Sequence, residues 1–433
     1  MSNYKRANEL NKIGRWEQAL PFAERAISDG RQSPNNWCLL GWTLNGLGRY
    51  ADALAATEEA LRLNPDSEWA HRIRSIALGH LGRRTEALKA AREAVRQAPN
   101  EWRAWSRLAG TAHQLGYPVD AREAAERAVE LGPDQASPWV TLSYVCLDEH
   151  REEAANAALR ALRLEPENTV ALNNLGAARL LQGRYSEARD IFDRGIATGS
   201  EYARLVFNRA RATAYIDGLE AGAAEYARAL TLVFSVSDRR LREDPANAAV
   251  HAERSALLRL RDGDHVASLE AARRAVVLDP RSAAAWGSLS EAAKSLDRWS
   301  LARYAARRAV QAEPSVPSRW LQAAFTAQYA GLPDEARRWA LRVVEEAPDS
   351  TLLTYASALL ALLDGDPGQA RDLGLQEIER YGESCCHRMF VLNCCLELGD
   401  TEGARDALDR AEHWRPRCHC HARTRWERIL AGS

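Results

Sequence analysis

Proline returns at a fixed interval along this chain of 433 residues. Pro65, Pro99 and Pro133 are each 34 residues apart, and the apolar pattern between them repeats at the same interval. The series continues with small shifts at Pro166, Pro245, Pro280, Pro314, Pro348 and Pro416. A period of this length is typical of one supersecondary unit stacked many times. Because each unit contacts only its neighbours, the sequence predicts an elongated solenoid and not several globular domains.

The segment 36–65 shows what one unit contains. Its apolar residues lie three and four positions apart in two runs, which is the spacing of the buried face of a helix. Gly48 lies between the runs and permits a tight turn, and Pro65 stops the second run from continuing as a helix. Gly41 and Ala53 are small enough to let the two helices approach closely. The unit is therefore predicted to be an antiparallel helix pair.

The same residue types occupy the same places in successive units. The unit described above carries Trp37, Leu40, Gly41, Leu44, Gly48, Tyr50, Ala53, Ala60 and Pro65, and a later one carries Trp105, Leu108, Ala109, Gly116, Ala121, Ala128 and Pro133. This pattern resembles the tetratricopeptide repeat. The resemblance implies about twelve repeats in an all-α, right-handed superhelical solenoid of antiparallel helix pairs. It also implies that the first helix of each pair lines a concave groove that binds peptides or partner helices.

The repeat rhythm is interrupted once. The interval from Ser200 to Pro245 is 45 residues where the period would give 34. We therefore divide the chain into an N-terminal array at 1–200, a divergent repeat at 201–245, a C-terminal array at 246–416 and an amphipathic capping helix at 417–433. The cap would shield the apolar side of the last repeat from water. The divergent segment is either an elongated second helix or a hinge or partner-docking element between the arrays.

Composition and charge exclude several classes of function. The chain has 58 basic and 59 acidic residues, interspersed, so a phosphate-attracting nucleic-acid groove is not expected. No apolar stretch approaches the roughly 20 residues that cross a bilayer, so no membrane partner is expected. The start of the chain shows no secretion signal, and the eight cysteines fit a reducing compartment, which together predict a cytoplasmic protein. Abundant alanine and arginine with only four lysines is typical of a GC-rich bacterial genome.

The predicted concave face supplies the candidate binding residues. On the first helices of the N-terminal array this face is rich in hydrogen-bond donors and has no carboxylate. Asn can pair with the amides of an extended peptide, Arg and Lys can hold carboxylates, and Trp can bury an apolar side chain. The candidates are Asn8, Asn11, Lys12, Trp42, Asn45, Trp69, Arg72, His80, Arg103 and His113. They predict a protein or peptide partner of acidic or carboxylate-bearing character.

Further along the chain the same face becomes more apolar, with Leu321, Phe325 and Leu359. Two interpretations are open. These residues either accept an amphipathic helix from a second partner or close a narrow superhelix.

Cysteine and histidine gather near the end of the chain, where six of the eight cysteines follow residue 384. Cys386 and Cys420 are 34 residues apart, as are His387 and His421, so they occupy equivalent places on neighbouring first helices. Side chains converging from such helices could hold one tetrahedral zinc ion. Reactive thiols, a disulfide and plain packing are the alternatives, and Cys394 and Cys395 are best interpreted as core residues.

The sequence contains no phosphate loop, nucleophile elbow, HExxH or dinucleotide fingerprint, so we expect neither an enzyme nor a cofactor other than the zinc ion considered above. The leading hypothesis is a scaffold or adaptor that binds a peptide segment or partner protein in its groove. Two alternatives remain open at this point. One is a metal- or redox-responsive protein that uses the C-terminal cluster, and the other is an accessory subunit that presents a substrate to a separate enzyme.

Overall fold

The computed structural model describes residues 2–29, 33–148, 150–199, 203–261, 264–348, 350, 352–381 and 385–414. These residues form 24 helices and no strand. The helices are α1 (Asn3–Lys12), α2 (Trp16–Ser28), α3 (Pro34–Gly46), α4 (Tyr50–Leu63), α5 (Glu68–His80), α6 (Arg84–Gln97), α7 (Trp102–Gln114), α8 (Pro118–Leu131), α9 (Ala136–Val145), α10 (Arg151–Leu164), α11 (Thr169–Leu181), α12 (Tyr185–Ala197), α13 (Ala203–Asp217), α14 (Leu219–Glu243), α15 (Ala248–Arg261), α16 (His265–Leu278), α17 (Ala283–Lys294), α18 (Trp299–Ala312), α19 (Pro317–Tyr329), α20 (Pro333–Glu346), α21 (Leu353–Leu363), α22 (Pro367–Tyr381), α23 (Cys385–Leu398) and α24 (Thr401–Trp414).

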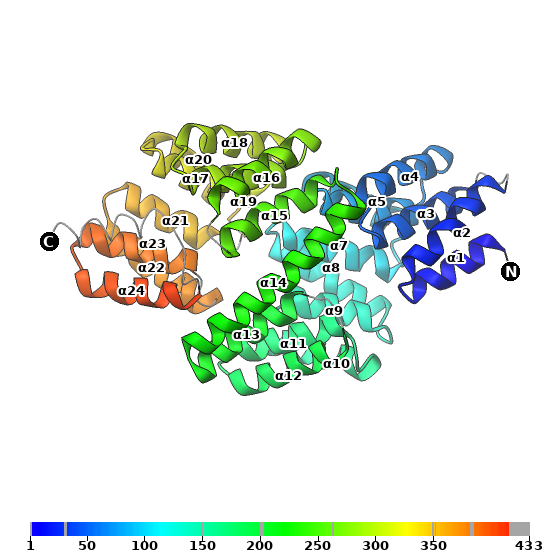
Figure 1. The fold of residues 1–433 in the computed structure, drawn as a ribbon, viewed down its shortest axis with the longest axis horizontal. Coiled ribbons are helices and arrows are strands. Elements are labelled where there is room, and N and C mark those ends of the chain that lie inside the picture. The colour runs from blue at the N-terminus through cyan, green and yellow to red at the C-terminus, as the bar shows by residue number, and fades with distance from the viewer. Residues whose placement is uncertain are drawn as a thin grey trace.

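Each odd-numbered helix packs against the even-numbered helix that follows it, and successive pairs stack along the chain (Figure 1). The predicted all-α solenoid of helix pairs is therefore confirmed. The first helix, α1, and the last, α24, lie at opposite ends of the molecule, and α14 runs between the two parts of the solenoid. None of the described helices is long and apolar enough to span a membrane. The predicted capping helix at 417–433 lies outside the described residues.

The repeated proline has a partner in the structure. The proline carbonyl oxygen has no partner within a helix, because the preceding helix has ended. The side chain six residues after the proline forms a hydrogen bond with this oxygen. Tryptophan indole N–H groups donate this bond over 2.7 to 2.8 Å in the pairs Trp105 to Pro99, Trp139 to Pro133, Trp286 to Pro280 and Trp320 to Pro314. A ring nitrogen of His71 makes the same contact with Pro65 over 2.9 Å. One periodic bond thus fixes the start of many first helices.

Small residues bring the two helices of a pair together. Ala53 and Ala60 are fully buried, and so are the residues in the same places of later repeats, such as Ala121 and Ala128. Gly176 in α11 shows how tight the contact is, because a Cβ atom there would lie 2.4 Å from Cε1 of the buried Phe192. The predicted role of small residues in close helix approach is seen at Gly41 as well, where a Cβ would lie 3.2 Å from Thr57.

The divergent repeat contains one exceptionally long helix. α14 has 25 residues, whereas the second helices of the pairs on either side, α12 and α16, have 13 and 14. Leu230, Val233 and Phe234 on α14 are buried in an apolar cluster that also contains Leu257 of α15. The additional residues therefore extend a second helix, which is the first of the two interpretations given above.

The solenoid coils so tightly that repeats six pairs apart touch. The turn inside one pair meets the start of a pair in the next coil, where Asn247 donates to the Gly48 carbonyl over 3.2 Å and the Tyr117 hydroxyl donates to the Ser315 carbonyl over 2.7 Å. A Cβ on Gly82 would lie 2.6 Å from that of Ala284. We call this row of contacts the inter-coil seam. It also contains the bonds from Arg84 to Glu313 and from Arg151 to Glu379.

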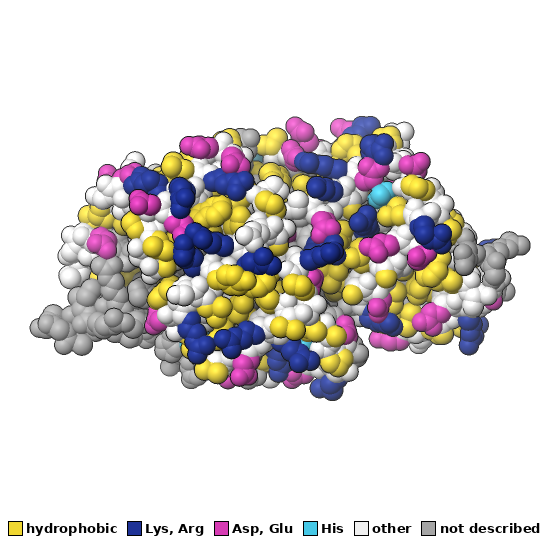
Figure 2. Space-filling model, turned by 90° about the horizontal axis from the view of Figure 1, so that it is seen from above, with side chains coloured by type: hydrophobic (Ala, Val, Ile, Leu, Met, Phe, Trp, Pro, Cys, Tyr) yellow, Lys and Arg dark blue, Asp and Glu magenta, His cyan; other side chains and the backbone are white. Residues whose placement is uncertain are grey.

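The outer surface carries charges of both signs. Figure 2 shows acidic and basic side chains interspersed with apolar ones over one face of the molecule. Many of them pair across one helical turn, as Arg49 does with Asp52 and Arg62 with Glu59. Exposed pairs of this kind each stabilise the fold by about 1 kcal/mol at most.

Two helical glycines give a test of the packing. Gly176→Ala should lower the free energy of unfolding by about 1–3 kcal/mol, because the added methyl group has no room beside Phe192. Gly110→Ala in α7 should raise it by about 0.5–1 kcal/mol, because nothing lies within 4 Å of the new Cβ and alanine favours the helix. Urea unfolding followed by circular dichroism measures both changes, and shifts of the same sign would contradict the packing described here.

Candidate functional site

The face that was predicted to be concave lies on the first helices of the pairs, of which the first four are α1, α3, α5 and α7. All ten candidate residues lie on these first helices, with Asn8, Asn11 and Lys12 on α1, Trp42 and Asn45 on α3, Trp69, Arg72 and His80 on α5, and Arg103 and His113 on α7. They do not form one cluster. They divide into an aromatic group, two buried amides, paired arginines and two histidines, and each group has its own surroundings.

Aromatic rings form a ladder near the start of the chain. Trp42 lies edge to face between Trp16 and Trp69, with ring centroids 5.9 and 6.4 Å away. Trp42 and Trp69 are half-buried, and both contact apolar clusters that include Cys38 or Leu39. Edge-to-face pairs contribute about 0.5–1.5 kcal/mol beyond the burial of area. The ladder is therefore part of the packing, and it leaves ring surface on which an apolar side chain can lie.

Two of the predicted amides lie inside the array. Asn11 donates to the Thr43 hydroxyl over 2.9 Å, and Asn45 donates to the Ile73 carbonyl over 3.1 Å. Both side chains are buried. Each joins one first helix to the next, so we leave Asn11 and Asn45 out of the site proposed below. Asn8 is half-buried and Lys12 is exposed on α1.

The expectation of a face without carboxylates was wrong. The Arg72 guanidinium is bonded to Glu68 over 2.7 Å, one helical turn earlier on α5. Arg103 is paired with Glu101 over 3.0 Å and lies over the Trp102 ring. The sequence pattern missed these acids because Glu68 and Glu101 lie at the very start of their helices, at the edge of the face.

The two predicted histidines are held against aromatic rings. His80 stacks on Tyr50 with the ring centroids 4.2 Å apart, and the surrounding protein, with Arg107 and Arg240, lowers its pKa to about 4. His113 lies edge to face on Tyr144 and 3.9 Å from Asp148. Burial also lowers the pKa of His113, although Asp148 opposes the shift. At neutral pH His80 is therefore uncharged and cannot serve as a cation.

The structure adds Arg107 on α7, which the sequence analysis did not select. Its guanidinium donates to the Ser75 hydroxyl over 3.0 Å and to the Ser75 carbonyl over 3.2 Å. Among the described residues no carboxylate lies within ion-pair distance of it, and burial lowers its pKa to about 10. Arg107 follows Arg103 by four residues, so helical spacing could have pointed to it. It remains charged at neutral pH.

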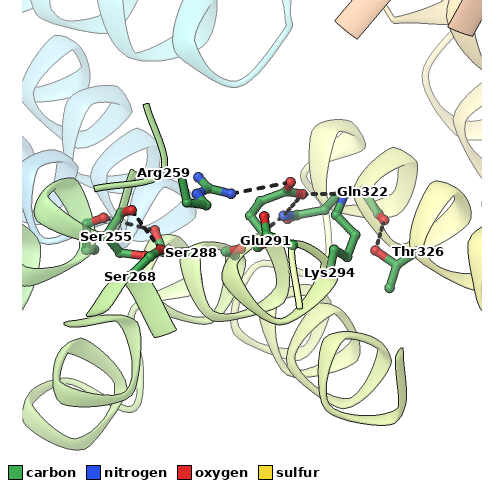
Figure 3. A network of polar contacts seen from close by, with 11 residues as sticks. Ser255, Arg259, Ser268, Ser288, Glu291, Lys294, Gln322 and Thr326 are labelled. Atoms are coloured by element: carbon green, nitrogen blue, oxygen red, sulfur yellow. Dashed lines mark hydrogen bonds and ion pairs between the residues drawn. The ribbon is translucent and has the colours of Figure 1, made fainter. Parts of the chain in front are cut away.

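A second polar group lies on the first helices of the second coil, α15, α17 and α19. Glu291 accepts a bond from Lys294 over 2.8 Å and lies 3.7 Å from Arg259, and Gln322 donates to it over 3.1 Å. Burial would raise the pKa of Glu291, but Lys294 and Arg259 outweigh it and lower the pKa. Figure 3 shows this network on the side of its helices that faces the first coil. Two cations here surround one carboxylate.

The apolar residues further along the concave face are core residues. Leu321 and Leu359 are buried. Phe325 packs against Tyr355 and Phe390 at centroid distances of 4.8 and 6.0 Å. These side chains pack within and between neighbouring repeats, and the second partner surface stays a prediction.

The predicted zinc ligands cannot be placed. The side chains of Cys386 and His387, and all of Cys420 and His421, lie outside the described part of the chain. In that described part, no group of three or more His, Cys, Asp or Glu side chains is arranged to hold a metal ion. Cys394 and Cys395 are buried, which confirms their interpretation as core residues, and burial raises the pKa of Cys394 to about 12.

The paired helices, the close contacts at small residues and the polar concave wall define a helical-repeat protein. The tetratricopeptide repeat family model matches residues 4–68, 74–136, 148–203 and 253–317, which is more than half of the chain. The chain belongs to the tetratricopeptide repeat family. Arrays of this family are scaffolds for protein–protein interaction, and this chain is such a scaffold.

Solved structures with a similar fold include several repeat proteins. One is TTC0263, a thermophilic tetratricopeptide repeat protein from Thermus thermophilus, with 22% identity, 41% of this chain and 97% of that chain covered, and a TM-score of 0.39. Another is PilF from Pseudomonas aeruginosa, with 18% identity, coverage of 47% and 92%, and a TM-score of 0.38. Yeast Tom70 has 14% identity, coverage of 87% and 98%, and a TM-score of 0.37. No curated protein matches the sequence.

The lowered pKa of His80 predicts a pH dependence of stability. In the unfolded chain His80 titrates near 6.5, and in the folded chain near 4. Between these values only the unfolded chain takes up this proton, so stability is fully present above pH 6.5 and falls as the pH is lowered towards 4. His80→Gln should therefore flatten the dependence of the urea midpoint on pH in this window. The exposed His150→Gln is the control, and equal slopes in wild type and His80→Gln would contradict the shift.

Proposed function

We propose that this scaffold binds a carboxylate-bearing segment of a partner protein on its concave wall, with Arg107 as the central contact. The observation that carries the proposal is a half-buried cation without an acidic partner in the described part of the chain. Two other arginines on these first helices are already matched, Arg72 by Glu68 and Arg103 by Glu101. Arg107, by contrast, can offer its charge to a partner.

Burial makes such a charge costly. Removing an ion from water costs several kcal/mol, and two hydrogen bonds to the neutral Ser75 offset only part of this. A partner carboxylate would supply the opposite charge and a pair of parallel hydrogen bonds, each worth about 1.5–3 kcal/mol. The free energy is gained only in the complex, so it contributes directly to affinity.

The facing wall favours the same class of ligand. Arg259 and Lys294 both lie within ion-pair distance of Glu291. In the described part of the chain, Gln322 keeps one buried side-chain oxygen without a hydrogen-bond partner. A segment that reaches this wall would meet two cationic side chains, together with an amide that can accept a backbone N–H. This supports the acidic character that the sequence analysis predicted.

The aromatic ladder would supply an apolar anchor. Trp42 and Trp69 lie on the same series of first helices as Arg107, two and one repeats earlier. A segment in an extended conformation would cover this distance while its carboxylate lies on Arg107. Asn8, Lys12, Arg72 and His113 are further predicted contacts along the same path. Proteins of this family are typically not enzymes, and we propose binding without catalysis for this chain as well.

Replacing Arg107 tests the proposal. Arg107→Gln removes the charge and keeps an amide that can bond to Ser75, so it should reduce recovery of co-purifying partners from native lysate at least about tenfold. Arg92→Gln is the matched control, because Arg92 pairs with Asp120 on the exposed surface. Glu291→Gln should increase recovery, because it removes a carboxylate from the opposite wall. Quantitative mass spectrometry measures the recovery for all three variants. Unchanged partner recovery with Arg107→Gln would contradict the proposed role of Arg107.

A further inference from the structure

The inter-coil seam differs in kind from the rest of the packing. Helix pairs are held together by rows of buried alanine and leucine side chains. The seam consists mainly of single polar contacts, such as those from Asn247 to Gly48 and from Tyr117 to Ser315. Val316 adds an apolar contact to the seam, because its side chain is buried in a core cluster of the first coil. Such a row of contacts can separate while every helix pair stays folded.

Glu313 is the central polar group of the seam. It ends α18, is almost completely buried, and is bonded to Arg319 over 3.0 Å within its own coil. Its other oxygen accepts the backbone N–H of Arg84, the first residue of α6 in the other coil. A carboxylate at the start of a helix satisfies a free N–H group and matches the helix dipole. One buried carboxylate thus closes the seam by capping a helix six pairs away.

Contacts at four successive repeats, from Gly48 to Arg151, join the two coils along the seam. A partner that approached the first helices from between the coils would meet this row of contacts. The effect reaches the site itself, since Arg240 on α14 contributes to the low pKa of His80 on α5.

We propose that the inter-coil seam is a gate, which opens to admit the partner segment to the concave wall and closes behind it. This inference rests on the proposed function only for the identity of the partner segment that the gate admits. The opening itself is a property of the chain alone. A loop of a folded partner cannot thread through the end of a closed coil, so the gate decides whether such a loop reaches Arg107.

Access to the wall can be measured without a partner. Gly110 lies on α7 three residues after Arg107, and nothing lies within 4 Å of a Cβ built on it. A Gly110→Cys variant therefore places a reactive thiol beside the site without disturbing the packing. It is treated with polyethylene glycol maleimide, a bulky polymer reagent, and, separately, with the small reagent N-ethylmaleimide. Label is counted on the tryptic peptide 108–122, which contains no natural cysteine.

A leucine substitution that forces the two coils apart opens the seam, and a leucine at a second glycine serves as the matched control. Gly82 and Gly183 have the same backbone conformation, with φ of +74° and +76°, so a leucine at either position costs similar strain. At Gly82 a Cβ meets Ala284 at 2.6 Å and Ser282 at 2.7 Å, whereas at Gly183 nothing lies within 4 Å. In the Gly110→Cys background, Gly82→Leu should raise the rate of polymer labelling at least about tenfold. Gly183→Leu should leave it unchanged, and N-ethylmaleimide should react rapidly in every variant.

A milder pair of substitutions covers the case in which Gly82→Leu does not fold. Glu313→Gln with Tyr117→Phe removes the charge and one hydrogen bond from the seam and keeps the shape of both side chains. It should raise the polymer rate at least about threefold and increase the radius of gyration measured by X-ray scattering. Equal polymer rates in the intact and altered seams would overturn the gate. Because the reagent replaces the partner, this result is independent of whether Arg107→Gln changes partner recovery.

Discussion

The fold depends on close contact between helices at positions where only alanine or glycine fits. Ala53 and Ala60 are fully buried between their helices, and Gly176 leaves no room for even a methyl group beside Phe192. Because each repeat packs with the same small residues, each adds the same rotation and translation to the one before it. The overall coil is therefore the sum of many equal steps, and a larger residue at one interface would change the position of everything beyond it.

This regular step is what brings distant residues together. Six pairs complete one coil, so Gly82 meets Ser282 and Tyr117 meets Ser315, although nearly 200 residues separate them. The contacts are short because Gly82, like the carbonyl of Gly48, presents backbone without a side chain. Charges that lie on an open surface in a single repeat are enclosed once the coils meet. Arg107 is half-buried because its guanidinium packs on α5 of the preceding repeat, where it donates to Ser75.

Features that lie within a single repeat could be predicted from the sequence. The period placed the helix pairs, the turn at Gly48 and the small residues, because each of these is set by neighbours along the chain. It could not predict contacts that depend on the rotation per repeat. The bond that the Arg84 N–H donates to Glu313 has no signal in either segment, and Asn11 and Asn45 appear on the predicted face although the structure buries them. Glu68 escaped notice because it lies at a helix start.

Closure of the coil and the charge of Arg107 are linked through solvation. In the proposed gate, closing the coil would remove further water from the half-buried Arg107, and a guanidinium without an acidic partner is destabilised by that loss. The same residue that favours a carboxylate ligand would then also favour the open coil in the ligand's absence. A bound carboxylate reverses this preference, because the pair is strongest where water is excluded. A partner that binds the wall therefore shifts the coil towards its closed form by as much as its affinity differs between the two forms. Once the ligand has entered, electrostatic attraction between its carboxylate and Arg107 is enough to favour closure of the coil.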